Sequence, residues 1–396
     1  MHPIDELLTR GVTQVIDREH LEQRMRAGGP LRVKLGIDPT GPLLHLGRAV
    51  PLLKLRAFQD LGHLPVIVIG DFTGRIGDAS DKEAERRMLS RDEVEANMAG
   101  YLAQIGRILD MDRVEVTYNS DWLGPMSFEE VAHLSNHFSV AEMLDRDNFS
   151  KRYEEGKRIS LREFLYPLMQ GYDSVAVRAD VELGGNDQLF NLLAGRTLQK
   201  AYGQVPQDIV TFGMLEGTDG RKMSTTYGNI IAIADPPEEQ FGRVMRLKDE
   251  LILPYFELTT RASLERIDEV RSALARGLNP MEAKIMLAEE IVTLYHDAAA
   301  AYQARDAFLK VFRQRELPDK IPDVALPPGE RTLQNLLADA GLAPSRSEAG
   351  RLIRGGGVRV DGSVVTEVAH VIAVGASPIL VQVGRRRTAR VVVKAS

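Results

Sequence analysis

The chain of 396 residues has no cysteine, a single tryptophan and only 6% aromatic residues. Without cysteine it has no disulfide framework and no thiolate metal site. No apolar run approaches the ~20 residues that a membrane-spanning helix needs. The first residues, MHPIDELLTRG, carry acidic side chains in place of the apolar segment of a secretion signal. These absences predict a cytoplasmic protein that has no membrane partner.

Charge is distributed unevenly along the chain. The net charge is −6, yet residues 331–396 hold ten Lys and Arg against four Asp and Glu, a net of +6, so the first 330 residues carry −12. A small basic module attached to a large acidic one is typical of a protein that binds a polyanion at one end. A basic tail that only improves solubility is the alternative.

The length predicts two or three domains, and the first half alternates strand and helix. Strands expected over 33–37 and 66–69 flank a helical pattern over 47–61, which is a βαβ unit with parallel strands. Further strands are expected over 114–118, 175–183 and 209–214. The predicted fold class of residues 1–232 is α/β, a Rossmann-like doubly wound parallel sheet that forms a catalytic domain.

The remainder of the chain changes character twice. Residues 233–317 contain strong helix formers and predict an α-helical domain. Four prolines between 318 and 330 predict a linker. Residues 331–396 predict a small α+β module, with helices over 332–342 and 346–354 and a hairpin over 358–365 that turns at Asp361-Gly362.

A polar segment, Asp38-Pro39-Thr40-Gly41-Pro42-Leu43-Leu44-His45-Leu46-Gly47-Arg48, follows the first strand of the βαβ unit. It has neither a glycine-rich dinucleotide fingerprint nor a Walker A sequence. It does place a helix N-terminus at the carboxyl end of a strand, where free N–H groups favour anions. His45 is able to donate to a phosphate oxygen, and Gly47 leaves room for a ligand. A His-x-Gly taken alone is more often an ordinary loop feature.

A second polar segment, Gly217-Thr-Asp-Gly-Arg-Lys-Met-Ser-Thr-Thr-Tyr-Gly-Asn229, sets Arg221 and Lys222 side by side before three hydroxyl side chains. Such a loop is able to close over a triphosphate and bring cations to the leaving charge. A solvated hairpin is the alternative.

A predicted helix carries a polar stripe. Ser160 and Glu163 form a capping box that opens the helix. Tyr166, Gln170 and Asp173 then fall at i, i+4 and i+7 on one face. A phenol, an amide and a carboxylate in one line are suited to a zwitterionic amino acid with a polar para-substituent. The flanking residues are apolar, which argues against a merely solvated face.

His45-Leu46-Gly47 and Lys222-Met223-Ser224, taken together, resemble the paired signatures of class I aminoacyl-tRNA synthetases. The resemblance to bacterial tyrosyl-tRNA synthetases extends over essentially the whole chain. It rests on further motifs in matching order: Gly36-x-Asp38-Pro39-Thr40, Gly70-Asp71-Phe72-Thr73-Gly74, Gly77-Asp78, Tyr166-x-x-x-Gln170-x-x-Asp173 and Gly184-Gly185-x-Asp187-Gln188.

The resemblance implies an enzyme that activates tyrosine with ATP and transfers it to tRNA. The residues implied for tyrosine binding are Lys34, Gly36, Asp78, Tyr166, Gln170, Asp173 and Gln188. Those implied for ATP binding are Asp38, His45, Gly47, Arg48, Gly185, Asp187, Lys222, Ser224 and Thr225. Those implied for catalysis are Thr40, His45, Lys82, Arg86 and Lys222.

The C-terminal module resembles the S4 type of RNA-binding fold. Four of its arginines are expected to face RNA phosphates, namely Arg346, Arg351, Arg354 and Arg359. The resemblance further implies a homodimer joined through an insert at about 120–158. L-tyrosine, ATP and tRNA(Tyr) are the implied partners, with Mg²⁺ bound through ATP and no protein-held metal or organic cofactor.

Several positions depart from the common pattern of the family, among them Asn186, which replaces a common Ser or Thr. Arg48 replaces a histidine, Thr225 replaces a lysine, and Lys34 stands where many members have a tyrosine. Two alternatives therefore stay open. One is a related chain that has lost aminoacylation and acts as an RNA-binding or regulatory protein, and the other is a ligase for another aromatic amino acid.

Overall fold

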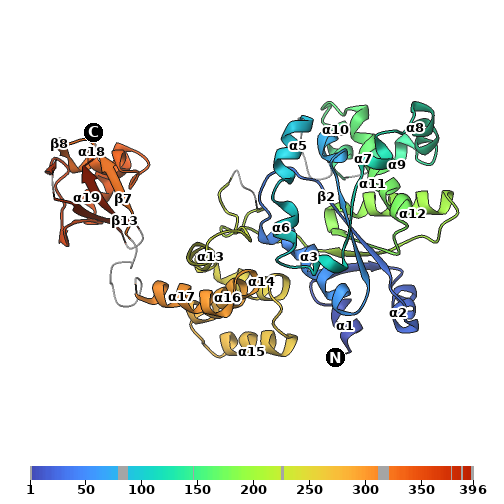
Figure 1. Ribbon diagram of the computed structural model, residues 1–396, viewed down its shortest axis with the longest axis horizontal. Helices are drawn as coiled ribbons and strands as arrows, with labels where there is room; N and C mark the ends of the chain where they lie inside the picture. Colours follow the sequence, from blue (N-terminus) through green and yellow to red (C-terminus); the bar gives the residue numbers. More distant parts are fainter. Residues whose placement is uncertain are drawn as a thin grey trace. The chain divides into compact units, whose positions relative to one another are not determined.

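The computed structural model describes residues 2–78, 88–145, 147–223, 227–310, 321–375, 377–384 and 387–393. The chain divides into two compact units, Met1–Ala301 and Tyr302–Ser396 (Figure 1). Four of the predicted site residues, Lys82, Arg86, Ser224 and Thr225, lie outside the described residues.

The first unit is built on a six-stranded sheet with the order β1-β6-β5-β2-β3-β4. The strands are β1 Val12–Ile16, β2 Arg32–Ile37, β3 Leu64–Ile69, β4 Glu115–Tyr118, β5 Val181–Gly185 and β6 Asp208–Phe212. Neighbouring strands are parallel except at one edge, where β1 runs antiparallel to β6. Strand β6 is buried along its whole length, as expected of a strand covered on both faces. The predicted doubly wound sheet is confirmed, with one added antiparallel edge strand.

The strand order reverses between β2 and β5. The chain moves from β2 to β3 in one direction along the sheet and from β5 to β6 in the other. Because such crossovers are right-handed, helices α3 (Leu46–Asp60) and α12 (Leu189–Ala201) lie on opposite faces. The crevice at the carboxyl ends of the strands beside such a reversal is where open α/β sheets bind ligands. The fold therefore directs attention to the residues that follow β2 and β5.

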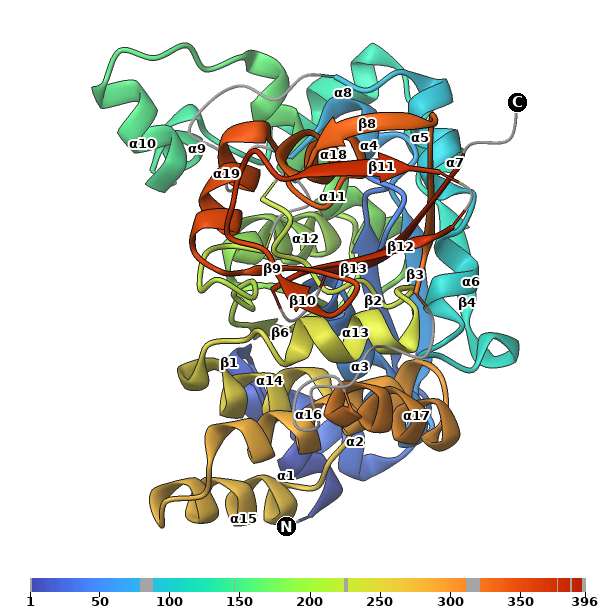
Figure 2. The same cartoon turned by 90° about the vertical axis from the view of Figure 1, so that its left-hand side faces the viewer.

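The other helices of the sheet region lie before β2 or between β3 and β5. They are α1 Pro3–Leu7, α2 Arg18–Ala27, α4 Thr73–Ile76, α5 Arg91–Met98, α6 Tyr101–Ile105, α7 Ser120–Leu123, α8 Phe128–Ser135, α9 Val140–Leu144, α10 Asp147–Glu154 and α11 Leu161–Val177. Helices α8–α10, in the predicted insert, lie at the end of the unit opposite to α1 and α2 (Figure 2).

One predicted strand is wrong in part. The expected strand over 175–183 begins inside α11, which continues to Val177 and ends at Arg178 in the left-handed region, with φ of 52°. Only from Val181 does the chain form β5. A short apolar run such as Val175-Ala-Val177 has the same pattern in a buried helix as in a buried strand, so periodicity did not separate the two.

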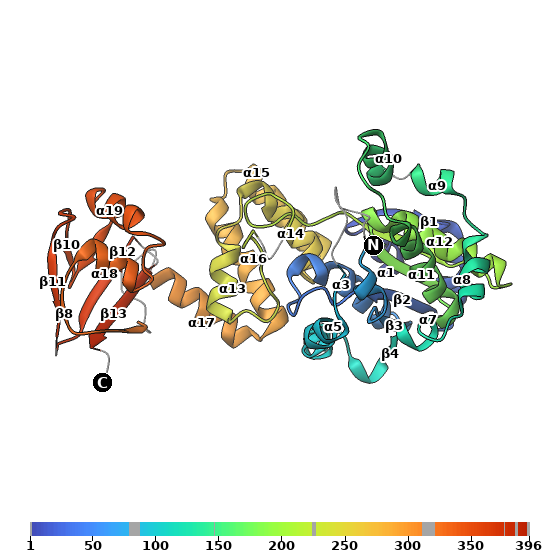
Figure 3. The ribbon, with the colours of Figure 1, turned by 90° about the horizontal axis from the view of Figure 1, so that it is seen from above.

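Beyond the sheet the first unit is helical, as predicted. The helices are α13 Pro237–Val244, α14 Ile252–Thr259, α15 Leu264–Ala275 and α16 Pro280–Tyr295, and α17 Ala298–Leu309 crosses the boundary into the second unit. Figure 3 shows α13–α16 gathered beside α3, and α14 packs against α3. Residues up to Ala301 therefore form one compact unit with the sheet, whereas the sequence predicted a separate domain from residue 233.

Beyond α17, the described residues of the second unit form two helices, α18 Leu333–Asp339 and α19 Arg346–Arg354, and two sheets. The larger sheet has the order β10-β9-β12-β13-β7, and β11 pairs with β8. The strands are β7 Asp323–Leu326, β8 Gly329–Thr332, β9 Val358–Val360, β10 Ser363–Val364, β11 Val371–Val374, β12 Ile379–Val383 and β13 Arg387–Val393. Leucines of α18 and valines of β12 and β13 form its core.

The predicted linker over 318–330 is wrong for residues 323–326, which form β7 and pair in parallel with β13. Val324 and Leu326 contribute to the core of the unit. Pro322 and Pro327 flank the strand without interrupting it, so the proline-rich composition concealed a short edge strand.

Candidate active site

The two signature segments meet at the start of α3. His45 forms a short antiparallel bridge with Ala232, just after the second segment. The amide of Gly47 lies 3.4 Å from the sulfur of Met223. A Cβ on Gly47 would come within 3.2 Å of the His45 ring, so glycine permits this close approach. A thioether is a weak acceptor, and a phosphate oxygen would compete well for the Gly47 amide.

His45 occupies the N-cap position of α3 with an unpaired nitrogen. Its Nδ1 is buried and has no hydrogen-bond partner among the described residues. Burial, and then the nearby Arg48, lower the pKa of His45 to about 4. The ring is therefore neutral near pH 7 and leaves a buried polar atom for a ligand at the N-terminus of a helix.

Arg48 is held within the protein. Its guanidinium donates to the Thr40 hydroxyl and, at 2.5 Å, to the hydroxyl of Tyr101. Burial raises the pKa of Tyr101, so this phenol stays protonated. Arg48 thus fixes the loop after β2 and positions Thr40 at the edge of the site.

Asp38 connects that loop to α11. Its carboxylate accepts from the Thr73 hydroxyl at 2.7 Å and from the Tyr166 hydroxyl at 2.9 Å. A Cβ on Gly70 would lie 2.0 Å from Asp38 Oδ1, so only glycine leaves room for this carboxylate. Gly36, two residues before Asp38, faces open space at the carboxyl end of β2.

Helix α11 presents the predicted polar stripe to the interior. The capping box is present, since the Ser160 hydroxyl accepts from a first-turn amide and the Glu163 carboxylate accepts from the Ser160 amide. Tyr166 is 7% exposed and Asp173 is 3% exposed. The stripe is therefore not a solvated surface.

Asp173 is a buried carboxylate with two fixed donors. Trp122 Nε1 donates to it at 2.8 Å and Asn119 Nδ2 at 3.3 Å. Burial raises the pKa of Asp173 to about 7, although the charge of Lys34 and these two bonds oppose the rise. Asn119 also donates to Thr73, so the carboxylate is joined to the residues around Asp38.

Four side chains form a continuous amide and carboxylate chain across the crevice. Gln188 Nε2 donates to Asp78 at 2.6 Å. Asn191 Nδ2 lies 3.0 Å from both Gln188 Oε1 and Gln170 Oε1. Asp78, Gln170 and Gln188, which the sequence assigned to the amino acid, are thereby brought together. Asp187 is exposed at the end of β5, next to Gly185.

Lys34 has a different environment from the one predicted. The side chain is fully buried and contacts Glu182, Ser174 and the carbonyl of Gln170. Its ammonium group donates to Gln170 and Ser174 and forms an ion pair with Glu182, so protein groups already surround it. Contact between Lys34 and tyrosine remains a prediction that the geometry does not favour.

Internal polar contacts join the described residues of the second signature segment, 217–223 and 227–229. Arg221 pairs with Asp219 at 2.6 Å, and its guanidinium lies 4.7 Å from the centre of the Tyr227 ring. Hydrogen bonds from Asn229 and Arg221 hold the pKa of Asp219 well below its usual range. Lys222 is exposed and its carbonyl accepts from Asn229 at 3.1 Å.

The residues that sequence reasoning missed are those that hold the predicted ones. They are Asn119 and Trp122 beside Asp173, Asn191 between the glutamines, and Glu182 beside Lys34. Two signals were present in the sequence. Asn119 directly follows a strand end at the same edge as Asp38, and Asn191 lies one helical turn after Gln188.

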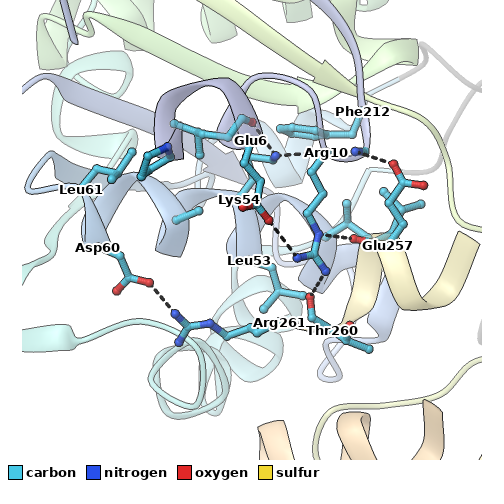
Figure 4. Close-up of a pocket in the computed structure, with 16 residues that line it drawn as sticks. Glu6, Arg10, Leu53, Lys54, Asp60, Leu61, Phe212, Glu257, Thr260 and Arg261 are labelled. Carbon is cyan, nitrogen blue, oxygen red and sulfur yellow. Dashed lines mark hydrogen bonds and ion pairs between the residues drawn. The ribbon is translucent and has the colours of Figure 1, made fainter. Parts of the chain in front are cut away.

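A hollow of about 250 Å³ between α1, α3 and α14 lies outside this site (Figure 4). Its two most buried basic side chains, Lys54 and Arg10, donate hydrogen bonds to backbone carbonyls. Lys54 donates to the carbonyls of Leu7 and Arg10, while Arg10 reaches the carbonyls at the end of α14. The hollow is a structural junction.

One group of three potential metal ligands occurs among the described residues: Asp17, His20 and Asp208. The His20 ring lies 2.9 and 3.1 Å from the two oxygens of Asp208, and Asp17 pairs with Arg196 at 3.5 Å. These contacts are a hydrogen bond and an ion pair that serve packing, and the bond between His20 and Asp208 joins α2 to β6.

The four arginines predicted to bind RNA are all exposed in the second unit. Arg346, Arg351 and Arg354 lie on α19, and Arg359 lies on β9. The hydroxyl of Ser345 caps α19 as predicted. Asp361 and Gly362 have positive φ angles of 46° and 84°, as the predicted hairpin turn requires.

Comparison with known proteins agrees with this geometry. The family described as tRNA synthetases class I (W and Y) matches residues 26–313, and the S4 domain matches residues 331–376. The tyrosine–tRNA ligase of Moorella thermoacetica is 49% identical over 390 residues, which cover 97% of this chain and 94% of that protein. The tyrosine–tRNA ligase of Thermotoga maritima is 47% identical over 388 residues, which cover 98% of this chain and 96% of that protein.

Solved structures share the fold of the first unit. A C-terminally truncated mitochondrial tyrosyl-tRNA synthetase of Coccidioides posadasii has a TM-score of 0.64 at 23% identity, covering 77% of this chain and 91% of that one. The tyrosyl-tRNA synthetase of Archaeoglobus fulgidus, solved with L-tyrosine, has a TM-score of 0.60 at 21% identity, covering 76% and 98%. With nearly full-length relatives at almost half identity, the chain belongs to the tyrosine–tRNA ligases, a family of class I aminoacyl-tRNA synthetases, and carries an S4 domain.

Proposed function

We propose that the chain performs the reaction of its family in two steps in the crevice beside β2 and β5. The tyrosine carboxylate attacks the α-phosphate of ATP in line, which gives tyrosyl-adenylate and pyrophosphate. A terminal ribose hydroxyl of tRNA then attacks the adenylate and releases AMP. The observation that carries the proposal is the buried polar stripe of α11, which ends at Asp173.

We assign the amino acid to the chain of polar side chains. Asp173 accepts the phenol proton, while Asp78, Tyr166 and Gln170 surround the ammonium group and Gln188 lies near the carboxylate. The hydrogen bonds among Asp78, Gln188, Asn191 and Gln170 support this assignment, because they fix several acceptors before a ligand arrives.

We assign ATP to the start of α3 and the ends of the neighbouring strands. His45 and Gly47 face its phosphates. Asp187 and Gly185 face the ribose. Asp38, Thr40 and Arg48 shape the loop that connects β2 to α3. Lys222 supplies charge at the leaving pyrophosphate. By family resemblance Lys82 and Arg86 do the same, while Ser224 and Thr225 contact ATP through their hydroxyl groups. Mg²⁺ arrives with ATP and offsets part of the phosphate charge. No protein nucleophile is needed, so catalysis rests on positioning and charge stabilisation.

The second unit is assigned to the tRNA. Arg346, Arg351, Arg354 and Arg359 are exposed cations in a module with a net charge of +6, which suits phosphate contacts along an RNA backbone. We infer that tRNA(Tyr) spans the two units, with its acceptor end at the crevice. Because this substrate serves translation, we also propose a cytoplasmic location.

We further propose that the chain forms a homodimer through the insert at 120–158. Phe128 in this insert is 90% exposed and Val140 is 64% exposed, and nearby Leu161 is 80% exposed. Large apolar side chains grouped on one end of a protein favour a protein–protein contact. No described helix is long and apolar enough to cross a membrane.

Tyrosine-dependent exchange of pyrophosphate into ATP tests the first step directly. The expected result is exchange with tyrosine and far less with phenylalanine or tryptophan. Preference for another aromatic amino acid would support the alternative ligase, and absence of exchange with retained tRNA binding would support the RNA-binding alternative. Sedimentation of the wild type beside a Phe128→Ser variant tests the dimer, and a monomeric wild type would contradict it.

A further inference from the structure

A buried ion pair lies behind the tyrosine-binding stripe. Lys34 on β2 and Glu182 on β5 are 0% and 1% exposed, and Lys34 Nζ is 2.8 Å from Glu182 Oε1. Burying two charges costs desolvation energy that their attraction often does not recover, and removing one partner leaves the other stranded. A pair of apolar side chains would fill the same space, so the charges themselves require an explanation.

The pair is also hydrogen-bonded to α11. Lys34 Nζ donates to the carbonyl of Gln170 at 3.0 Å and to the hydroxyl of Ser174 at 2.8 Å, two residues one turn apart that bracket Asp173. Ser174 donates in turn to Glu182 Oε2 at 3.0 Å. Strands β2 and β5 are thereby linked to the turn of α11 that carries Asp173.

The donors that surround Asp173 are already in use. The single N–H of Trp122 goes to Asp173, and Asn119 Nδ2 is shared between Thr73 and Asp173. Lys34 is occupied by the three acceptors described above. A para-substituent that reaches Asp173 therefore meets a carboxylate acceptor, while Trp122 and Asn119 have no proton left to offer it and Lys34 is held by Gln170, Ser174 and Glu182.

We propose that Lys34, paired with Glu182, is a positioning residue that keeps Asp173 an ionised acceptor and thereby selects amino acids whose para-substituent donates a hydrogen bond. The inference rests on the proposed function and specifies how that site chooses its substrate. The charged groups that face Asp173 are Lys34 from β2 and Glu182 from β5, and they lower and raise its pKa respectively. The neutral donors are Trp122 of α7 and Asn119 after β4.

The test is the pH profile of kcat/KM for tyrosine in pyrophosphate exchange, between about pH 6 and pH 9, on either side of the Asp173 pKa of about 7. Lys34→Met should move the midpoint to higher pH, because the positive charge that favours an ionised Asp173 is lost while the negative charge of Glu182 remains. Since a nearby opposite charge commonly changes the proton affinity of a carboxylate tenfold or more, kcat/KM at pH 7 should fall roughly fivefold, mainly through KM. Glu182→Gln should move the midpoint the other way.

Arg152→Met is the matched control. Arg152 of α10 and Glu163 of α11 form a second buried ion pair, at 2.6 Å and each 2% exposed, and Glu163 lies ten residues before Asp173 on the same helix. Its loss should lower the melting temperature without moving the midpoint. The double variant Lys34→Met/Glu182→Gln, which strands no charge, should return the midpoint toward that of the wild type. If Lys34→Met does not fold, the direction in which Glu182→Gln and the double variant move the midpoint still tests the prediction.

Substrate choice gives a second readout. The wild type should activate 4-aminophenylalanine, whose amine donates, and should reject 4-methoxyphenylalanine, which only accepts. Unmoved midpoints in folded variants, or equal activation of the two analogues, would overturn the inference while leaving tyrosine activation intact. A wild type that shows no tyrosine-dependent exchange would instead reject the proposed function.

Discussion

At the scale of single residues, the site depends on where buried protons and charges are placed. His45 is kept neutral by burial and by the neighbouring Arg48, so in the proposed site its unpaired nitrogen would meet phosphate without adding a charge. Arg48 and Arg221 are both held by partners of their own. We therefore expect neither to substitute directly for the lysine that Thr225 replaces, and under the proposed mechanism Lys222 stabilises more of the leaving charge.

Asp173→Asn should separate recognition of the phenol from binding of ATP. The amide keeps the shape of the carboxylate but cannot accept from Trp122, Asn119 and tyrosine on equal terms. Because a hydrogen bond to a charged group contributes roughly 1.5–3 kcal/mol, we expect kcat/KM for tyrosine to fall about 10- to 100-fold, with little change in the KM for ATP. Pyrophosphate exchange at varied tyrosine, phenylalanine and ATP measures both effects. An unchanged ratio of tyrosine to phenylalanine would contradict the assignment.

At the scale of secondary-structure elements, the sequence predicts what is local and misses what is distant. The capping box of α11, the cap of α19 and the Asp361-Gly362 turn follow from residues within three or four positions of each other. The contacts of Asp173 with Asn119 and Trp122 join positions 54 and 51 residues apart, which no periodicity encodes. The contacts of Lys34 with α11 could not be predicted either, because they depend on how β2 packs against that helix.

Arg10 should matter for stability more than any exposed arginine of the helical region. Its guanidinium donates to the carbonyls of Phe256, Glu257, Thr260 and Ala262, so it satisfies acceptors left free at the C-terminal end of α14. Arg10→Met should lower the free energy of unfolding by about 2–4 kcal/mol. Arg266→Met is the control, since its exposed pair with Glu269 contributes roughly 0–1 kcal/mol. Urea unfolding measures both, and equal losses would refute the capping role.

Lys54 in the same junction should make the free energy of unfolding depend on pH. Burial, reinforced by Arg10, lowers its pKa to about 7 from 10.5, so between these pH values the unfolded chain binds a proton that the folded chain does not. The stability of the wild type relative to Lys54→Met should therefore increase as the pH rises through this window, by about 1.4 kcal/mol per pH unit. Urea unfolding of both proteins at several pH values shows the slope, and parallel curves would exclude it.

At the scale of the whole molecule, charge and fold divide at the same part of the chain. The unit built on the large sheet belongs to the acidic part, and the S4 domain lies in the segment with a net charge of +6. An anionic catalytic unit disfavours nonspecific RNA contact, while a cationic module supplies attraction that salt weakens. This division predicts that tyrosine activation and tRNA binding are separable.

Truncation after Lys310 should therefore leave adenylate formation within about twofold of the full chain and weaken tRNA charging. The cut has to precede β7, because a chain that kept residues 323–326 without β13 would expose an unpaired strand edge. Each phosphate contact removed should flatten the salt dependence of tRNA binding by about one unit of slope on logarithmic axes. The full-length variant Arg346→Gln/Arg354→Gln is the matched control, because it removes two exposed cations of α19 while leaving the fold of the module in place. It should raise the KM for tRNA and flatten the slope in the same direction, by less than the truncation does. Truncated and full-length chains with the same KM for tRNA and the same salt dependence would show that the second unit does not bind the tRNA.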